Sequence, residues 1–361
     1  MLETLAYIEG TKYITMFLKP FSISIIISLA MVHSALAKPY VINEFGDTVI
    51  GEVQTTRAEL KDTLLDIGRS YGFGYFDMKL INPKLDTWLP GEGAEVLLPS
   101  QFILPHAPRK GIVMNVPEMR LYYYPPAKAG EPQEVYTYPL GVGREGWNTP
   151  YITTKIIEKK ESPNWYPPES IRKEHEENGD PLPKIVKAGP DNPLGDFAMR
   201  LGKPEYLIHG TNKPYGVGMR VSHGCIRLYP EDIESLFQKV SLNTPVKIIN
   251  QPYKIGVKGD EIYLEAHPFL EEDAKDFENN LTSVVNLLVK IADDRDYEID
   301  WSIAYEEINN PSGVPIMIGM YLPTLMQAKV EEKLKAALSQ AKQVNLQLQL
   351  DSKINLNTTT N

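Results

Sequence analysis

Alternation of apolar and polar positions dominates the middle of the chain and predicts a mainly β domain. Between residues 111 and 252, short runs rich in Ile, Val and Tyr are separated by turn residues, a pattern typical of strands. One clear helix is predicted here, from Pro230 to Val240, because apolar residues share one face behind a proline at the first helical position. The predicted strands are residues 112–116, 120–124, 135–140, 151–159, 197–201, 206–209 and 246–249.

A helical pattern precedes this region and predicts a small α+β unit over residues 38–103. Asp62 and Thr63 form an N-cap ahead of a short amphipathic segment that ends at Gly72. The helical part of this unit therefore precedes the β-rich region in the sequence. Its other predicted elements are a helix at 75–81, a turn at 89–93, a strand at 94–98 and a linker at 104–110.

Two further stretches differ in composition. Residues 160–195 are rich in Pro, Glu and Lys and predict a long loop, which in a compact domain commonly forms a lid or a substrate wall. Residues 253–345 predict a C-terminal extension whose role the sequence does not indicate, and the polar tail at 346–361 is predicted to be disordered. The extension's predicted elements are a strand at 261–265 and helices at 271–292 and 325–344.

The N-terminus predicts an export signal. Residues 21–32 form an uncharged, largely apolar run that is too short to span a bilayer core of about 30 Å as a helix. Ala35-Leu36-Ala37 is a small-x-small cleavage site, so residues 1–37 are predicted to be a signal peptide, with Met16 as an alternative start. A cleaved signal leaves no stable membrane span in the mature chain. An uncleaved membrane anchor is the competing interpretation.

Composition and charge exclude nucleic acid as a partner and single out one side chain. The 361 residues predict two or three domains, and they carry a net charge of −10 with no basic block to bind phosphates. The one cysteine, Cys225, cannot form an internal disulfide. In an exported protein a lone thiol is an oxidation liability unless its reactivity is used, and a buried inert thiol is the alternative.

The residues around Cys225 supply what a thiol nucleophile requires, namely a base, donors for an oxyanion and space for a carbonyl. His209 ends a predicted strand and is the candidate base, with a structural strand-end histidine as the alternative. Gly224 allows close backbone approach, so its N–H and that of Cys225 are candidate oxyanion donors. The carbonyl of Gly210 can accept His209 Nδ1–H and fix the tautomer in place of a carboxylate.

This segment resembles the signature of the L,D-transpeptidase (YkuD-type) catalytic family: a histidine, a spacer, then Ser/Thr-His-Gly-Cys, an apolar residue and Asn or Arg. Here His209 is followed by Ser222-His223-Gly224-Cys225-Ile226-Arg227. The resemblance covers residues 111–252 and implies a mainly β, sandwich-like catalytic domain. Tyr151 stands where a Pro-x-Gly turn is expected, a minor departure that leaves the catalytic residues untouched.

The resemblance implies a reaction on peptidoglycan. The thiol of Cys225 attacks the diaminopimelate–D-Ala bond of a tetrapeptide stem, and the histidine gives its proton to the leaving amine. The resulting thioester passes to a second amine: a diaminopimelate side chain (3-3 crosslinking), a lysine of an anchored outer-membrane lipoprotein, or a free D-amino acid. Carbapenems are expected to acylate the same cysteine, and no metal or organic cofactor is needed.

The N-terminal unit resembles the LysM fold, which binds N-acetylglucosamine-containing glycans, most clearly over residues 82–99. A LysM-like unit ahead of such a catalytic domain matches the Gram-negative periplasmic branch of the family. The resemblance therefore implies a periplasmic protein that binds both stem peptides and glycan. A small packing domain without glycan affinity is the alternative.

Other residues of the motif have subsidiary expected roles. Ser222 is expected to order the loop by hydrogen bonds. His223 is expected to act structurally or on the oxyanion side rather than as the primary base. The arginines can hold a stem-peptide carboxylate by bidentate bonds. The substrate-binding candidates are Arg220, Arg227, Asn212 and Tyr215.

Several competing interpretations follow from the same residues. A zinc site is not expected, since the chain lacks a second cysteine and a His-x-x-x-His pair. Residues 141–146 match G-x-G-x-x-G, but Pro150 blocks the helix that a dinucleotide site requires, so we interpret them as a turn between strands. Two other functions stay open: a non-catalytic wall-binding protein, and a cysteine L,D-carboxypeptidase in which water resolves the thioester.

Overall fold

The structure is a computed structural model. Its chain divides into Met1–Ser34 and a second, compact unit, Ala35–Asn361. The predicted signal peptide and tail lie outside the described residues, as does most of the helix predicted at 325–344. Within the described ranges, no helix is long and apolar enough to cross a membrane. The structure describes residues 39–42, 46–127, 129–277, 280–291 and 297–321, with Lys335, Ser339 and Lys342.

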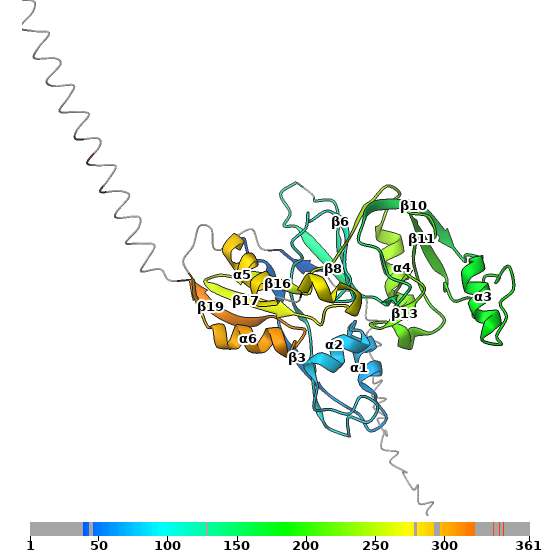
Figure 1. Cartoon of the computed structure of the whole chain (residues 1–361), viewed down its shortest axis with the longest axis horizontal. Helices are drawn as coiled ribbons and strands as arrows, with labels where there is room; N and C mark the ends of the chain where they lie inside the picture. The colour runs from blue at the N-terminus through cyan, green and yellow to red at the C-terminus, as the bar shows by residue number, and fades with distance from the viewer. Residues whose placement is uncertain are drawn as a thin grey trace, which may run out of the picture. The chain divides into compact units, whose positions relative to one another are not determined.

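A nine-stranded sheet forms the centre of the described chain, in the order β1-β8-β7-β6-β15-β10-β11-β12-β14 (Figure 1). The mainly β class and the strands predicted from the alternating pattern are confirmed, including the β6–β7 hairpin. The strands are β1 (Tyr40–Val41), β6 (Gly111–Asn115), β7 (Arg120–Tyr124), β8 (Glu134–Pro139), β10 (Thr153–Glu161), β11 (Phe197–Leu201), β12 (Leu207–His209), β14 (Ile226–Arg227) and β15 (Pro245–Ile249).

The predicted helix is present as α4 (Pro230–Lys239) and packs against the sheet. Ile233 and Leu236 of α4 join Met199 and Leu201 of β11 in one buried apolar cluster. Because α4 starts shortly after β14, this packing also anchors the strand that follows Cys225.

Two short strands, β9 (Val142–Gly143) and β13 (Arg220–Ser222), pair in parallel, and a 3₁₀ turn, η1 (Pro214–Gly216), precedes β13. The G-x-G-x-x-G sequence thus holds a strand and a turn, and the next described helix lies well beyond it. The rejection of a dinucleotide fingerprint is confirmed at the level of secondary structure.

The N-terminal part has a strand–helix–helix–strand order, of which the two helices and the second strand were predicted: β3 (Gln54–Arg57), α1 (Leu64–Tyr71), α2 (Tyr75–Ile81) and β4 (Glu95–Leu98). β3 pairs antiparallel with β4, and β2 (Val49–Gly51) pairs with β5 (Gln101–Ile103). Thr63 and Asp66 form a capping box, and Gly72 ends α1 with a left-handed φ of 79°. Both predicted helices are confirmed. Their ends could be predicted because the capping residues are close neighbours in the sequence.

The apolar core of this part is shared with the central sheet. Leu64 and Met78 belong to the same buried cluster as Tyr122 and Tyr124 of β7. Leu104, at the start of the predicted linker, is buried in that cluster as well. The N-terminal part therefore packs as an integral neighbour of the sheet, and its status as a separate LysM domain stays a prediction.

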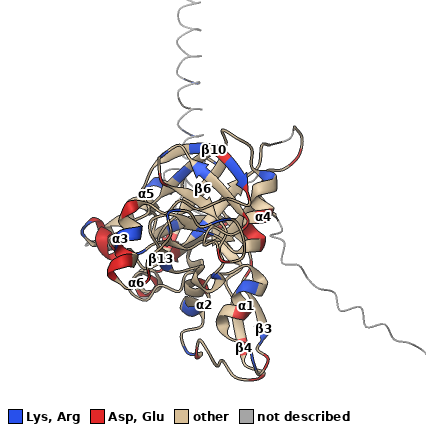
Figure 2. Cartoon of the chain, turned by 90° about the vertical axis from the view of Figure 1, so that its right-hand side faces the viewer, with Lys and Arg blue, Asp and Glu red and all other residues tan. Residues whose placement is uncertain are grey.

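The long loop predicted at residues 160–195 contains a helix, so that prediction is wrong in part. Helix α3 (Glu169–Glu177) carries a dense group of acidic residues (Figure 2). Only Ile171 is buried among its residues, so the segment shows no apolar stripe for sequence analysis to detect. Glu174 instead contacts Arg144 and His223, which belong to other segments.

The C-terminal extension is a folded unit with its own core. Its sheet has the order β16-β17-β19-β18, and Ile255, Leu264, Val284 and Ile318 lie in one buried cluster. The α-helix predicted at 271–292 is wrong at its start, where the chain forms a 3₁₀ helix. The elements are β16 (Tyr253–Lys258), β17 (Glu261–Ala266), η2 (Glu271–Phe277), α5 (Asn280–Ile291), β18 (Tyr297–Ile299), α6 (Trp301–Asn309) and β19 (Ile316–Tyr321).

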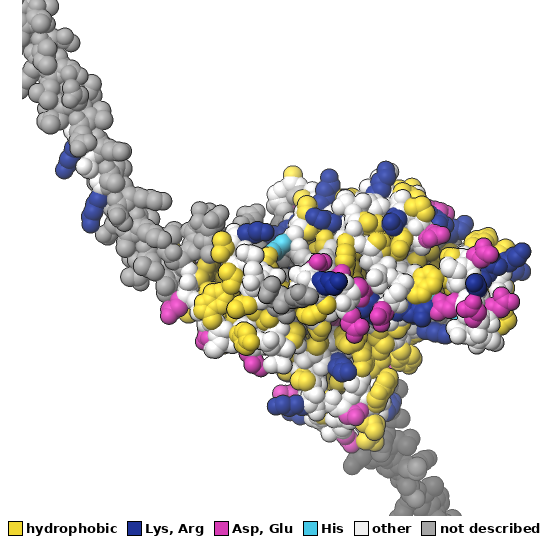
Figure 3. All heavy atoms as spheres, in the orientation of Figure 1, with side chains coloured by type: hydrophobic (Ala, Val, Ile, Leu, Met, Phe, Trp, Pro, Cys, Tyr) yellow, Lys and Arg dark blue, Asp and Glu magenta, His cyan; other side chains and the backbone are white. Residues whose placement is uncertain are grey.

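Hydrophobic side chains also gather on the outer surface of this unit, over α6 and β19 (Figure 3). The exposed members are Trp301, Ile303, Tyr305, Met317 and Met320.

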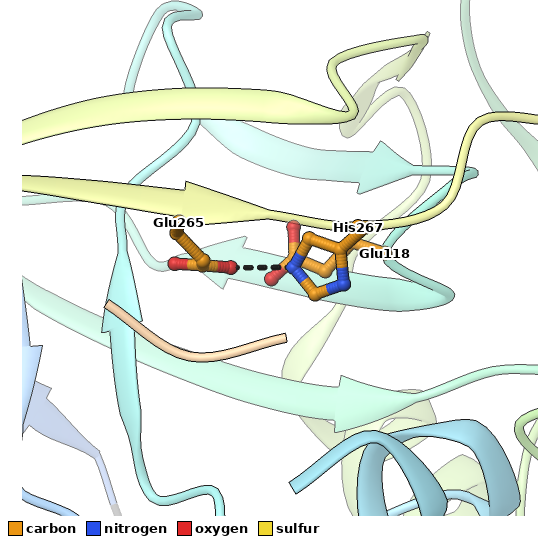
Figure 4. A group of neighbouring side chains, drawn as sticks. All are labelled: Glu118, Glu265 and His267. Atoms are coloured by element: carbon orange, nitrogen blue, oxygen red, sulfur yellow. Dashed lines mark hydrogen bonds and ion pairs between the residues drawn. The ribbon is translucent and has the colours of Figure 1, made fainter. Parts of the chain in front are cut away.

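A buried ionic cluster joins the three parts of the chain. Lys254 Nζ of β16 lies 2.9 Å from Glu118 Oε2 and 2.7 Å from Glu265 Oε1, and it donates to Ile103 O of β5 at 2.7 Å. His267 Nε2 lies 2.7 Å from Glu265 Oε1 (Figure 4). Burial would raise the pKa of Glu265, but Lys254 and His267 hold it below its usual value. The two carboxylates and the imidazole are close enough to suggest a metal site, yet the ammonium group already bonds both acids.

We predict that Lys254→Met destabilises the protein by about 3–5 kcal/mol, because it leaves two buried carboxylates without their cation. Urea unfolding followed by circular dichroism measures this change. Lys258→Met, on the same strand but only half-buried, is the matched control and should change stability little. Equal unfolding midpoints for the two variants would contradict a structural role for the cluster.

Candidate active site

The parallel pairing of β12 with β14 brings His209 and Cys225 to one face. His209 pairs with Arg227, and Ile208 pairs with Ile226. Paired residues in a parallel ladder project to the same side, and side chains two positions apart in an extended strand share a face. The two isoleucines are buried in the core, so His209 and Arg227 project from the opposite face, and Cys225, directly before β14, lines the same cleft.

That face opens into a cleft of about 900 Å³. His209, Cys225 and Arg227 line it together with Ser222, His223 and Asn212. Residues between Pro163 and Leu194 form much of the facing wall, which agrees with the substrate wall expected from the sequence. Tyr215 is 63% exposed and does not line this cleft.

His209 is buried and held by its own neighbour. Its Nδ1 lies 2.6 Å from Gly210 O, the contact expected from the sequence. Since a carbonyl only accepts, Nδ1 carries the proton and Nε2 keeps its lone pair. Burial, reinforced by the positive charge of Arg227, lowers the pKa of His209 to about 3. The imidazole is therefore neutral at physiological pH.

The turn that carries Cys225 is ordered by hydroxyl groups. Ser222 Oγ donates to Cys225 O at 2.6 Å, which agrees with the ordering role expected for it. Gly224 N–H donates to Ser222 Oγ at 3.2 Å, so this amide is engaged within the turn, and its role as an oxyanion donor stays a prediction. Gly224 has a φ of 96°, a conformation that favours glycine. Thr149, which the sequence analysis did not single out, donates to Gly224 O at 3.1 Å.

The thiol is protonated in this environment. Burial raises the pKa of Cys225, while the Leu207 backbone and the cation of Arg227 act in the opposite direction. Its Sγ donates to Glu205 O at 3.4 Å, and Glu205 has a left-handed φ of 71°, an uncommon conformation for a residue with a side chain.

Arg227 is a largely buried cation beside these groups. Burial lowers its pKa, and the neighbouring Cys225 acts against that shift. Its Nε has no hydrogen-bond partner among the described residues. This places a positive charge with unused donor capacity in the cleft wall.

His223 and Arg220 are engaged with other parts of the protein. His223 Nε2 lies 3.0 Å from Glu174 Oε2 of α3, and its ring packs edge-on against Trp147. Arg220 forms a two-point bond with Glu272 of η2 and is not available to a substrate carboxylate, so its predicted role is not supported. Asn212 lies in the wall of the cleft, and its Nδ2 donates to Asp191 O at a distance of 3.1 Å.

Comparisons with known proteins identify the family. A family model described as "L,D-transpeptidase catalytic domain" (YkuD) matches residues 109–248. The chain is 37% identical over 305 residues to "Probable L,D-transpeptidase ErfK/SrfK" of Escherichia coli K12, which covers 82% of this chain and 96% of that protein. It is 37% identical over 290 residues to "Probable L,D-transpeptidase YbiS" of the same organism, covering 79% and 93%. Since these alignments run through nearly the whole length of the relatives, the chain belongs to the YkuD-type L,D-transpeptidase family of cysteine-dependent acyltransferases.

Proposed function

We propose that this protein is a periplasmic L,D-transpeptidase of peptidoglycan in which Cys225 is the nucleophile and His209 the base. The observation that carries the proposal is the parallel pairing of β12 with β14, by which both side chains line one large cleft. The donor substrate is a tetrapeptide stem, attacked at the bond between diaminopimelate and the terminal D-Ala.

The protonation states favour acylation by general base catalysis. A neutral imidazole with its Nε2 lone pair available takes the thiol proton while the sulfur–carbon bond forms. The imidazolium then gives this proton to the D-Ala amine as the carbon–nitrogen bond breaks, leaving a thioester on Cys225. The Arg227 cation stabilises both the developing thiolate and the oxyanion.

An amine resolves the thioester in the second half-reaction. His209, neutral again, accepts a proton from the incoming amine as the new amide bond forms, and it returns this proton to the sulfur as the carbon–sulfur bond breaks. The candidate acceptors are a diaminopimelate side chain, a lysine of an anchored outer-membrane lipoprotein and a free D-amino acid. Water in place of the amine would make the enzyme a carboxypeptidase, and product masses from sacculi with each amine separate these cases.

We infer that the N-terminal part binds glycan. Leu60 and Trp88 are 73% and 59% exposed, on the loops that connect β3 to α1 and α2 to β4. Leu64 N–H donates to Thr87 O at 2.9 Å, which holds these two loops together. An exposed indole and an exposed apolar side chain on two joined loops suit the apolar face of a sugar ring.

Replacement of the nucleophile tests the proposed function. Cys225→Ala should abolish both D-Ala release and the mass increase caused by carbapenem acylation, because no other residue can form the thioester. Mass spectrometry of the intact protein and of muropeptide products measures both, with an unchanged thermal melt as the folding control. Continued D-Ala release by this variant would refute the assignment.

The pH dependence tests the protonation states. Iodoacetamide alkylation of Cys225 should accelerate about tenfold per pH unit below the raised thiol pKa, with no step near pH 6.5, because His209 stays neutral above about pH 3. His209→Gln should keep this profile but slow carbapenem acylation about 10²- to 10⁴-fold. A thiolate–imidazolium pair would instead keep the alkylation rate constant between about pH 5 and 7. Such a constant rate would contradict the mechanism.

Glycan binding is tested at the exposed indole. Trp88→Ala should weaken pull-down of the protein by purified sacculi about tenfold while carbapenem acylation is unchanged. Trp301→Ala, which removes an exposed tryptophan from the C-terminal unit, is the matched control. Equal retention of both variants on sacculi argues against the proposed glycan surface.

A further inference from the structure

Among its contacts with the active-site domain, the C-terminal extension forms an ion pair with Arg220. Arg220 Nη1 donates to Glu272 Oε2 at 3.0 Å and Nη2 donates to Glu272 Oε1 at 2.7 Å. Its Nε donates to Gly143 O at 3.2 Å. Both charged side chains are only about one-fifth exposed. The guanidinium therefore joins three segments, β13, β9 and η2, with a geometry that a planar fork fixes tightly.

The segment that presents Glu272 is itself fixed. Leu270 is buried in the apolar cluster of the catalytic sheet. Asp273 accepts hydrogen bonds from Asn250 Nδ2 at 3.0 Å and from the hydroxyl of Tyr151. Because the residues on both sides of Glu272 are anchored to the sheet, its carboxylate is held in place before Arg220 meets it.

Two routes connect Arg220 to the turn that carries Cys225, one along the backbone of β13 and one through hydrogen bonds across β9. Along β13 the chain runs directly to Ser222, whose hydroxyl donates to Cys225 O and accepts from Gly224 N–H.

Across β9, Gly143 N–H donates to Thr149 Oγ1 at 3.0 Å, and that hydroxyl donates to Gly224 O. A Cβ on Gly143 would lie 1.9 Å from Trp147 O, so the close approach of these two backbone segments requires glycine at this position. The two routes end on consecutive peptide groups, those of Gly224 and Cys225.

We propose that Glu272 is a positioning residue for the Cys225 turn and acts through Arg220. The inference rests on the proposed function, since it assumes that Cys225 is the nucleophile. It gives the C-terminal extension a role in the reaction: the extension fixes the peptide groups around the sulfur. Loss of the two-point bond should therefore slow the attack on a carbonyl, which needs an ordered turn, more than the attack on a small alkylating agent, which needs only the thiolate.

The experiment compares Glu272→Gln with the full-length wild-type protein. We expect carbapenem acylation of Cys225, followed by intact-protein mass, to slow about tenfold or more, whereas iodoacetamide alkylation and the thermal melt stay near wild type. Glu271→Gln removes a charge from the neighbouring exposed position and should leave all three values unchanged. Glu272→Asp keeps the charge on a shorter stem, and a partial loss is expected even if the glutamine variant does not fold.

A double-mutant cycle with Arg220→Gln tests the route. The effect of Glu272→Gln should disappear when Arg220 is already replaced, because the two residues act as one unit. Wild-type acylation by both Glu272 variants, or an undiminished effect of Glu272→Gln in the Arg220→Gln background, would overturn the inference. A lower melting temperature with faster alkylation would also overturn it, since that marks general loosening. If the wild-type protein itself is not acylated, the proposed function fails, and the two failures are thus distinguishable.

Discussion

Pairing of β12 with β14 is the constraint on which the rest of the site depends. These strands are short, yet their parallel register fixes which side chains face the core and which face the cleft. A shift of one position would bury the polar residues and expose Ile208 and Ile226. Burial of both isoleucines in the apolar cluster with α4 makes such a shift costly. The packing of the core therefore also fixes the geometry of the site.

Charge and burial then set the protonation states of His209 and Cys225 before substrate binds. Burial and the cation of Arg227 lower the pKa of the imidazole, which stays neutral, and partial burial raises the pKa of the Cys225 thiol, which stays protonated. In the proposed mechanism, the thiol proton therefore moves to the imidazole as the sulfur attacks the carbonyl, with no ion pair formed beforehand. Such an arrangement protects a single thiol from oxidation, because the thiolate is the reactive form.

The C-terminal extension is joined to the rest of the chain by ionic contacts. It contributes Lys254 to the ionic cluster that joins all three parts of the chain, and it contributes Glu272 to the network behind the nucleophile. Its fold also leaves an apolar surface over α6 and β19. The comparison with relatives is consistent with this integration, since the matched length extends far beyond the catalytic domain model.

Local signals in the sequence were sufficient for seven of the nine strands of the central sheet (all but β1 and β14), for the caps of α1, for the proline start of α4, and for placing His209 and Cys225 in one motif. They sufficed because periodicity, capping residues and motif spacing act over a few neighbouring positions. Helix α3 was missed because long-range polar contacts stabilise it in place of an apolar stripe. The partner of Arg220, the occupied amide of Gly224 and the role of Thr149 likewise depend on residues distant in sequence, and only the tertiary structure could decide which charge or hydroxyl meets which.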